Sequence, residues 1–316
     1  MNNKELSLNF NAIKKLAHWW KNNNYCNKVE IAALEPFLYK NNVYDIVDVI
    51  NLLQNFRFKL SITTNGILLK NFVDRLDKNS IDLIRVSWHS MDKCVYKYIT
   101  SNGDYDEFIS SLMSAINKQL PISINRVLLK NYTSDIREHI NFVDKYKLRL
   151  KLLDLYWTEE IKDIYDKFYV SPQEVLREFI EDKTIIFDKN TSVGRNRIIY
   201  KTKNNGIVEY KDKETANKNN AECKNCKDKL NCLEGYADYF RVFPNKLGTF
   251  CYMKPELDFL VFDENNEVVL QNNDIYKNTP LRLCVVGKCN FNCGFPKENI
   301  SWCLKRNRDF IFPKRS

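Results

Sequence analysis

The feature that most constrains the fold is a regular alternation of β-prone runs and helical stretches between residues 28 and 155. The runs are short and rich in apolar and β-branched residues, and we expect strands at 28–33, 59–63, 83–87, 121–129 and 148–155. Helical patterns fill the intervals, at 43–55, 68–76, 91–98, 104–119 and 133–146. Strands that alternate with helices over short connections pack as parallel βα units. The sequence therefore predicts an α/β barrel or an open doubly wound sheet.

The carboxyl ends of these expected strands carry the candidate site residues, because both architectures gather their chemistry there. The polar residues at these ends are Glu35, Thr64, Asn65, Ser87, His89, Asn125, Arg126 and Asp154. Several also have ordinary structural interpretations. Glu35 can cap the following helix, Asn65-Gly66 is a common turn, and Arg126 can pair with a surface acid. His89 suits a core position as well as a ligand pocket.

Other stretches extend the pattern at both ends of the chain. Helical periodicity covers 4–21 and 171–181, residues 183–215 hold short β-prone pieces, and 257–270 favours a hairpin. A further apolar run at 281–286 predicts a short buried strand.

The charge and hydropathy of the chain argue against nucleic acid and membrane as its partners. The net charge is +9 over 316 residues, but the lysines are scattered among asparagines without a dense basic block, so we do not expect nucleic-acid binding. The chain has no run of about 18 apolar residues, so we expect no membrane span. Its first 20 residues lack the order of a secretory signal, and a cytoplasmic location is the default expectation.

Cysteines cluster in the last third of the chain, where eight of the ten follow residue 220. In a cytosolic protein such clustering favours metal or cluster ligation over disulfides. One set, suited to tetrahedral zinc or to a four-iron cluster, comprises Cys223, Cys226, Cys232 and Cys251. Spacing alone does not decide between the two.

A second set, Cys289, Cys293 and Cys303, follows the expected strand at 281–286. Three protein thiolates would leave one iron of a four-iron cluster open to another ligand. Cys284, within the strand, is interpreted as a buried core residue.

Six stretches together resemble the radical S-adenosylmethionine (SAM) superfamily, and most of all its molybdopterin-precursor cyclase (MoaA-like) and SPASM-related branch. They are PLRLCVVGKCNFNC, KVEIAALEPFL, SITTNGILL, IRVSWHSMDKCVYKYIT, INRVLLKN and CKNCKDKLNCLEGYADYFRVFPNKLGTFC. The first resembles the loop that bears the family's CxxxCxxC motif, the second a strand that ends in GGEP, and the last an auxiliary-cluster region. These stretches extend over most of the chain.

The resemblance implies an α/β fold, a partial (β/α)6 TIM-type barrel with a small cysteine-rich auxiliary-cluster subdomain. It also implies one or two [4Fe-4S] clusters, SAM, and an electron donor of flavodoxin or ferredoxin type. A 5′-deoxyadenosyl radical made from SAM would take hydrogen from a small-molecule or peptide substrate. By position, the implied SAM contacts are Glu35, Thr64, Asn65, Ser87, His89, Asn125 and Arg126. The implied cluster ligands are Cys289 and Cys293, with Cys303 as a hypothetical third, and Cys223, Cys226, Cys232 and Cys251 at the auxiliary site.

Three features depart from the family pattern. The cysteine loop comes last in the chain instead of first, so the barrel order is permuted. Pro296 stands where the third cysteine is expected, and Cys303 would have to replace it through a longer loop. Ala33-Leu34 replaces the two glycines of GGE, which let a backbone approach a ligand closely.

These observations divide the chain into a barrel (1–182), a cysteine-rich region (183–258), and a hairpin with the displaced first strand (259–316). Two alternatives to a radical SAM enzyme stay open. One is a degenerate relative that retains only the auxiliary metal site and acts as a binding or partner subunit. The other is an unrelated α/β protein with a zinc knuckle.

Overall fold

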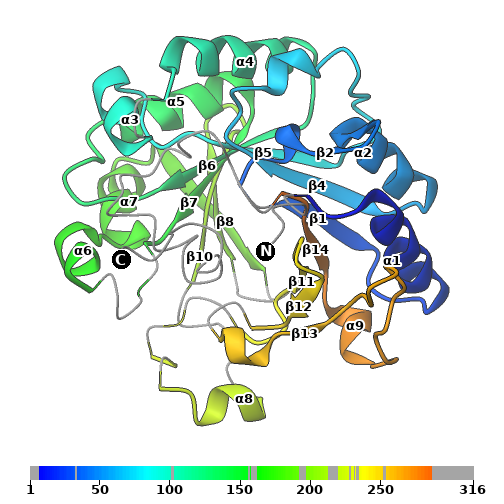
Figure 1. Ribbon diagram of the computed structural model, residues 1–316. Coiled ribbons are helices and arrows are strands. Elements are labelled where there is room, and N and C mark those ends of the chain that lie inside the picture. Colours follow the sequence, from blue (N-terminus) through cyan, green and yellow to red (C-terminus); the bar gives the residue numbers. More distant parts are fainter. Residues whose placement is uncertain are drawn as a thin grey trace, which may run out of the picture.

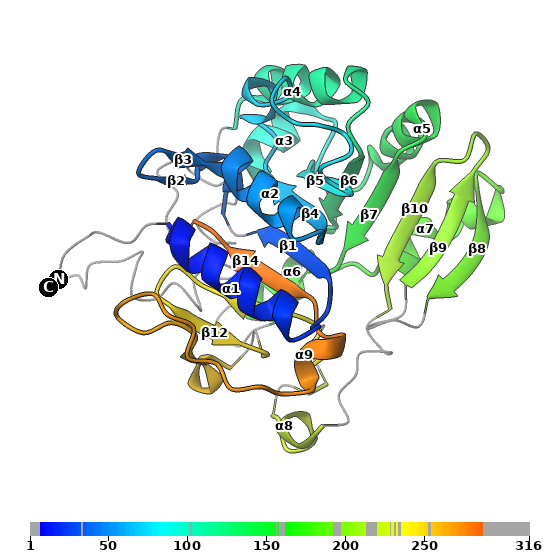
Figure 2. The same ribbon diagram turned by 90° about the vertical axis from the view of Figure 1, so that its right-hand side faces the viewer.

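A single curved sheet organises the molecule, with helices along its outer side (Figure 1, Figure 2). The computed structural model describes residues 7–32, 34–100, 103–155, 157, 162–191, 197–212, 220–227, 229–230, 232, 235–251 and 254–286. Within these ranges, twelve strands form the sheet in the order β13-β12-β11-β14-β1-β4-β5-β6-β7-β10-β9-β8. The parallel-rich sheet confirms the α/β class and is consistent with a partial TIM-type barrel.

Five strands in the middle of the sheet confirm the alternation expected from the sequence. They are β1 (Lys28–Ala32), β4 (Lys59–Thr64), β5 (Leu83–Ser87), β6 (Ile122–Val127) and β7 (Arg149–Leu153), each parallel to the next. The parallel run continues on one side with β10 (Ile207–Lys211), and on the other with β14 (Leu281–Cys284) and β11 (Phe240–Val242).

Antiparallel strands complete both edges. One edge has β9 (Arg197–Thr202) and β8 (Ile185–Thr191), and the other has β12 (Leu247–Thr249) and β13 (Phe259–Leu260). A separate small hairpin pairs β2 (Lys40–Asn41) with β3 (Tyr44–Asp45). The sheet thus runs without interruption from β13, through β14 and the predicted barrel strands, to β8.

The helices follow the strands as βα units require. They are α1 (Phe10–Asn22), α2 (Ile46–Asn55), α3 (Lys93–Ile99), α4 (Tyr105–Asn117), α5 (Ile136–Tyr146), α6 (Lys162–Phe168), α7 (Pro172–Glu181), α8 (Ala221–Lys224) and α9 (Ile275–Asn278). Short 3-10 turns occur at η1 (Pro36–Leu38), η2 (Leu69–Asn71) and η5 (Pro255–Leu257). Asp45 caps α2 in a capping box with Asp48. No described helix has the length and apolar character that a bilayer crossing requires.

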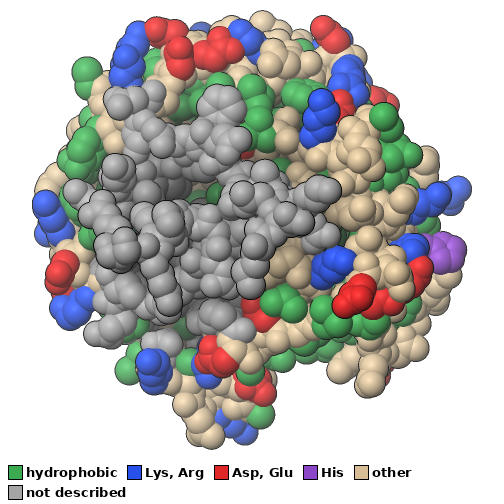
Figure 3. All heavy atoms as spheres, viewed as in Figure 1, with side chains coloured by type: hydrophobic (Ala, Val, Ile, Leu, Met, Phe, Trp, Pro, Cys, Tyr) green, Lys and Arg blue, Asp and Glu red, His purple; other side chains and the backbone are tan. Residues whose placement is uncertain are grey.

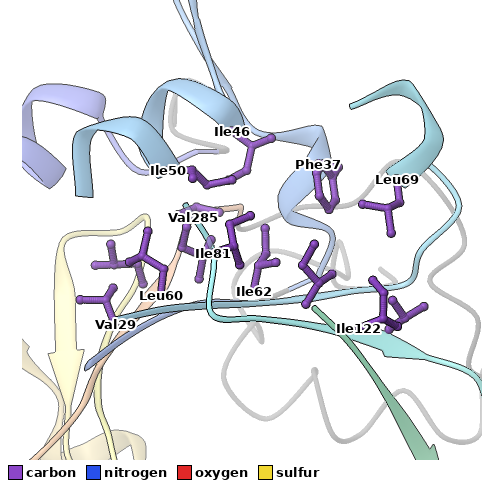
Figure 4. Packing of buried hydrophobic residues seen from close by; sticks show 14 of the residues in the cluster. Val29, Phe37, Ile46, Ile50, Leu60, Ile62, Leu69, Ile81, Ile122 and Val285 are labelled. Carbon is purple, nitrogen blue, oxygen red and sulfur yellow. The ribbon is translucent and has the colours of Figure 1, made fainter. Parts of the chain in front are cut away.

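The main core lies between the sheet and the helices. Val29, Leu60 and Ile62 project from β1 and β4 toward Ile46 and Ile50 of α2, as Figure 4 shows. All five side chains are almost fully buried. Because strand side chains alternate, this apolar face leaves every second residue of the same strands on the opposite, inner face of the sheet.

The predicted helix at 68–76 is wrong, because only η2 and turns form there. The hydroxyl of Ser111, on α4, accepts from the Lys70 amide at 3.0 Å and donates to the Ile67 carbonyl at 2.7 Å. A side chain of a neighbouring helix thus satisfies two backbone groups of this segment in its turn conformation. Gly66 begins this segment at φ +83°, and an added Cβ would lie 2.7 Å from Val86.

Strand β14 lies against β1, although the two are far apart in the sequence. Register pairs in β14 and β1 include Leu281 with Val29 and Cys284 with Ala32. Cys284 is buried, as expected. The Val285 amide continues the pairing to the Ala32 carbonyl at 3.3 Å. Residues that follow β14 thus leave the sheet at the same edge as residues that follow β1.

Candidate active site on the inner face of the sheet

The inner face of the sheet is polar, in contrast to the apolar face under the helices. Four of its residues form a row across neighbouring strands: Ser87 pairs in register with Asn125, Asn125 with Lys151, and Lys151 with Glu209. Ser87 and Asn125 are predicted ligand residues, so the structure brings this pair together. Asn125 is buried, and its Oδ1 has no hydrogen-bond partner within the described chain. A buried acceptor in this state suits a hydroxyl or amine donor from a ligand.

A charged network lies beside this row. Glu30 of β1 accepts from Thr63 Oγ1 and from Arg282 Nη2, each at 3.0 Å, and lies 3.4 Å from Arg85 Nη1. Burial favours the neutral acid, but the charges of Arg282 and Arg85 outweigh it and hold the pKa of Glu30 well below its ordinary value. The carboxylate therefore stays ionised and ties three barrel strands to β14.

The sequence prediction missed this network, although a signal for it was present. Glu30, Arg85, Lys151, Glu209 and Arg282 each stand between apolar neighbours within a short strand. Successive side chains of a strand point to opposite faces of the sheet. A single charged residue between two apolar ones therefore indicates that one face of the sheet is polar.

Glu35 occupies the end of β1, but its carboxylate is committed to the protein. Its Oε1 accepts from the Phe37 amide at 3.0 Å and from Thr64 Oγ1 at 2.7 Å, and its Oε2 accepts from the Asn65 amide at 2.7 Å. Asn65 Oδ1 in turn accepts from the Ile67 amide at 3.0 Å, as in an Asx turn. The geometry therefore supports the capping and turn interpretations of Glu35 and Asn65, and it joins Glu35, Thr64 and Asn65 to one another.

Changing Glu35 to glutamine should change how stability depends on pH. Burial raises the pKa of Glu35 to about 7 from an ordinary value of 4.5, against hydrogen bonds from Asn65, Thr64 and Phe37. The folded chain then holds this proton to higher pH than the unfolded chain, so this group lowers the free energy of unfolding progressively as pH rises from 4.5 to 7. Urea unfolding of the wild type and Glu35→Gln at pH 5 and pH 8 measures this loss.

The stability difference between these two proteins should shift by about 2–3 kcal/mol in favour of glutamine at the higher pH. Every other titrating group is common to both proteins and cancels. A difference that stays constant between the two pH values would contradict the raised pKa.

The side chain of Arg126, another predicted ligand, lies on the helix side of β6 and not beside Asn125. It is fully buried, and its Nη2 is 2.5 Å from Asp135 Oδ1 and 2.9 Å from the Tyr132 carbonyl. Its Nη1 contacts His139 Nδ1 of α5. Burial raises the pKa of Asp135, but the hydrogen bond and charge of Arg126 lower it to about 2. Arg126 thus joins β6 to α5 instead of facing a ligand on the inner face.

His89 is also buried at the end of β5, where its Nδ1 accepts from the Val127 amide at 3.2 Å. Burial and the charge of Arg126 lower the pKa of His89 to about 4. The ring is therefore neutral at pH 7, and the described contact fixes Nδ1 as an acceptor.

Only one of the two predicted cysteine sets lies within the described residues. Cys289, Cys293 and Cys303 lie outside the described residues. Cys223, Cys226, Cys232 and Cys251 are partly buried, and Tyr236 lies within electrostatic reach of Cys223 and Cys251. Across the described ranges, no group of three or more His, Cys, Asp or Glu side chains is arranged to hold a metal ion.

The radical SAM resemblance is confirmed by comparison with known proteins. Residues 1–143 match the model of the radical SAM superfamily. The matched region contains β1, β4, β5 and β6, and with them Ser87 and Asn125.

Curated relatives include enzymes named GTP 3′,8-cyclase. The protein of Clostridium botulinum (strain Okra / Type B1) is 26% identical over 182 residues, which cover 56% of this chain and 54% of the relative. A probable GTP 3′,8-cyclase of Pyrococcus horikoshii is 26% identical over 211 residues, 66% of each chain. The chain thus spans about half the length of the first of these relatives. These matches confirm the MoaA-like assignment.

Solved structures with a similar chain path include Streptococcus suis SuiB bound to S-adenosylmethionine, at 19% identity and a TM-score of 0.43 over 56% of this chain and 40% of that one. Another is anSMEcpe with bound AdoMet and the Cp18Cys peptide, at 15% identity and a TM-score of 0.41 over 55% and 52%. The cofactors of the superfamily are a [4Fe-4S] cluster and SAM. The buried Oδ1 of Asn125, which has no hydrogen-bond partner in the part of the chain that the structure describes, fits a hydroxyl group of SAM.

Proposed function

We propose that the chain is a radical SAM enzyme that reductively cleaves SAM and uses the 5′-deoxyadenosyl radical to take hydrogen from a small molecule or peptide. The single observation that carries this proposal is Asn125. It lies within the region that matches the radical SAM model, on the inner face, with a buried acceptor that has no hydrogen-bond donor among the described residues. Ser87, in register with it, supplies a hydroxyl on the same face.

In this proposal β14 is the displaced first strand of the barrel. Its parallel pairing with β1 supports that role, because β14 and β1 end at the same edge of the sheet, near the hydrogen-bonded pair Glu35 and Thr64. Cys289 and Cys293 would then approach SAM from the strand where the family carries its cluster, with Cys303 as the third ligand. The bound cluster would supply the electron that cleaves SAM.

The protein's own residues have separable roles in this chemistry. Asn125 and Ser87 would bind and orient SAM, and Glu35 would position the end of β1 through Thr64 and Asn65. Leu34 stands where the family has the second glycine of GGE. Its φ is +38°, in the left-handed region that glycine favours. The backbone shape of that loop is thus compatible with its family role without the glycine.

We propose an auxiliary [4Fe-4S] cluster on Cys223, Cys226, Cys232 and Cys251, and a flavodoxin- or ferredoxin-type reductant in the cytoplasm. A degenerate protein that retains only this auxiliary site is the second candidate. Pro296 at the third cysteine position and Ala33-Leu34 in place of two glycines favour that alternative.

Iron content separates the two candidates. Anaerobic reconstitution with iron and sulfide should give about eight irons per chain for the enzyme, and about four for the degenerate protein, because each cluster holds four. Cys303→Ala should lower the enzyme's value to about half if Cys303 is the third ligand. Cys94→Ala, at an exposed cysteine on α3, is the matched control and should not change it. Unchanged iron in Cys303→Ala would exclude Cys303 as a ligand.

A further inference from the structure

Three aromatic rings form a row across segments that follow neighbouring barrel strands. Tyr98 of α3 stacks on Tyr132, with ring centroids 5.6 Å apart and an interplanar angle of 20°. Tyr132 in turn contacts Phe168 of α6, with ring centroids 6.0 Å apart and an angle of 41°. Figure 1 shows α3 and α6 on the same side of the molecule. We call Tyr98, Tyr132 and Phe168 the aromatic strip.

The aromatic strip lies at the same edge of the sheet as the candidate site. Tyr98 lies between β5 and α4, Tyr132 between β6 and α5, and Phe168 between β7 and α7. Segments that join the end of a parallel strand to the helix that follows it lie at the carboxyl edge of the strands. Ser87, the last residue of β5, lies at that edge too. A molecule bound to the strip would therefore border the candidate site.

Backbone hydrogen bonds hold the aromatic strip in place. The Lys130 amide donates to the Phe168 carbonyl at 2.7 Å, which joins the loop after β6 to the end of α6. Arg126 Nη2 donates to the Tyr132 carbonyl at 2.9 Å. Tyr132 and Phe168 are partly buried, whereas Tyr98 is 50% exposed. The strip thus presents mainly one aromatic ring to solvent on a fixed support, and a surface that is already ordered loses little entropy on binding.

Exposed lysines flank the aromatic strip. Lys97 and Lys167 directly precede two of its rings, and Lys130 comes shortly before the third. The Nζ of Lys167 lies 5.0 Å from the centroid of the Phe168 ring. None of these three lysines has a carboxylate within ion-pair distance in the part of the chain that the structure describes. Their charges are therefore available to a partner.

The acids on the same segments leave this strip positively charged. Within the described residues of α3, of α6 and of the loop 130–132, the acids are Asp163 and Asp166. Asp166 pairs with Lys162, which leaves Asp163 against the three flanking lysines. Around the rim of the molecule, Figure 3 shows Lys and Arg interspersed with Asp and Glu. Aromatic rings and lysines together, and not charge alone, distinguish the strip.

We propose that the aromatic strip and its three lysines dock an acidic peptide segment of the substrate that carries an aromatic side chain. Carboxylates of the segment would pair with the lysines, and its ring would pack on Tyr98. A single-stranded nucleic acid is also a polyanion with stacking rings, but it binds best where several ring faces are exposed in succession. Tyr132 and Phe168 are partly buried against each other, which favours the peptide.

Fluorescence anisotropy with labelled probes tests the proposal on the full-length reconstituted protein, without SAM or reductant. The main probe is a short glutamate–glycine peptide with a central tryptophan. Its companions carry lysine in place of glutamate or alanine in place of tryptophan, and a further probe is labelled oligothymidylate. The wild type should bind the acidic tryptophan peptide most tightly, with an affinity that falls as salt is added. Equal binding of the lysine peptide, or tighter binding of oligothymidylate, would overturn the proposal.

A triple variant tests the role of the lysines. Lys97→Gln, Lys130→Gln and Lys167→Gln together should weaken binding of the acidic peptide about tenfold, because three exposed ion pairs are lost. The matched control removes the same charge at three other exposed lysines, with Lys14→Gln, Lys59→Gln and Lys78→Gln. It should bind the peptide as the wild type does. Equal losses in the two triple variants would overturn the docking surface.

Tyr98→Ala tests the aromatic contact separately from the charges. The wild type should prefer the tryptophan peptide to the alanine peptide, and the variant should bind both equally, because the exposed ring of the strip is lost. A preference for tryptophan that persists in Tyr98→Ala would overturn the role of this ring.

The word substrate rests on the proposed radical SAM function, whereas peptide binding does not. Without added peptide, the variant of the three flanking lysines should form as much 5′-deoxyadenosine as the wild type, since these residues lie outside the candidate site. A protein that binds the acidic peptide but forms no 5′-deoxyadenosine would overturn only the enzyme proposal. A protein that forms 5′-deoxyadenosine but does not bind the peptide would overturn only the docking proposal.

Discussion

Replacing Arg126 with alanine is expected to lower the free energy of unfolding by about 3–5 kcal/mol. The substitution removes a fully buried side chain and leaves the Asp135 carboxylate without its cation. Asp135 also accepts from Ser90 Oγ at 2.7 Å and from the Met91 amide, so the change affects the ends of β5 and β6 and the start of α5 together. An unpaired charge in a buried position lowers the free energy of unfolding by more than the intact ion pair raises it.

Urea unfolding of the wild type and Arg126→Ala measures this effect directly. Arg75→Ala is the matched control, because Arg75 pairs with Asp45 at 2.5 Å but is half exposed, and it should cost at most about 1 kcal/mol. If Arg126 instead served mainly as a SAM ligand, its loss would leave the unfolding midpoint near that of the control and would weaken SAM binding. That outcome would contradict the structural role.

The second large effect is expected at Cys289. If Cys289 is the first ligand of the SAM-binding cluster, Cys289→Ala should remove that cluster and lower 5′-deoxyadenosine formation by at least 100-fold, because the electron for cleavage comes through the cluster. Iron content should fall by about four per chain, with the auxiliary cluster retained. The readouts are iron analysis and product formation under reducing anaerobic conditions.

Cys26→Ala controls for the loss of a thiol elsewhere in the region that matches the radical SAM model, since Cys26 lies in the short segment before β1. It should retain both clusters and at least half of the activity. Equal product from Cys289→Ala and the wild type would exclude Cys289 as a ligand and would place the proposed displaced strand in doubt.

The strand and helix alternation was the part of the fold that sequence could predict, because each barrel strand is a short apolar run between helical periods. The helix at 68–76 could not be excluded in this way. Its apolar spacing suits a helix, but Ser111, some 40 residues later, accepts the Lys70 amide and binds the Ile67 carbonyl. Such a tertiary contact has no local signal. The short pairing of β11 with β14 also depends on residues far apart in the chain.

In the candidate site, too, some features could be predicted from the sequence and others depend on tertiary contacts. Asn125 and Arg126 are adjacent in sequence and were predicted as ligands together, but neighbouring residues on a strand point to opposite faces. Ile122 and Ile124, which share the side of Arg126, are buried among the helices, and this pattern was a signal that could have separated the two. The hydrogen bonds of Glu35 to Thr64 and Asn65 could not be predicted, because they depend on how β1 and β4 end beside each other.

The central claim is that the chain cleaves SAM, and the most direct test is dithionite-dependent formation of 5′-deoxyadenosine. The anaerobically reconstituted full-length protein is incubated with SAM and dithionite, and the product is measured by chromatography with mass detection. We predict product in the wild type that requires dithionite and is lost in Cys289→Ala. A wild-type protein that holds about eight irons per chain but forms no 5′-deoxyadenosine would contradict the claim.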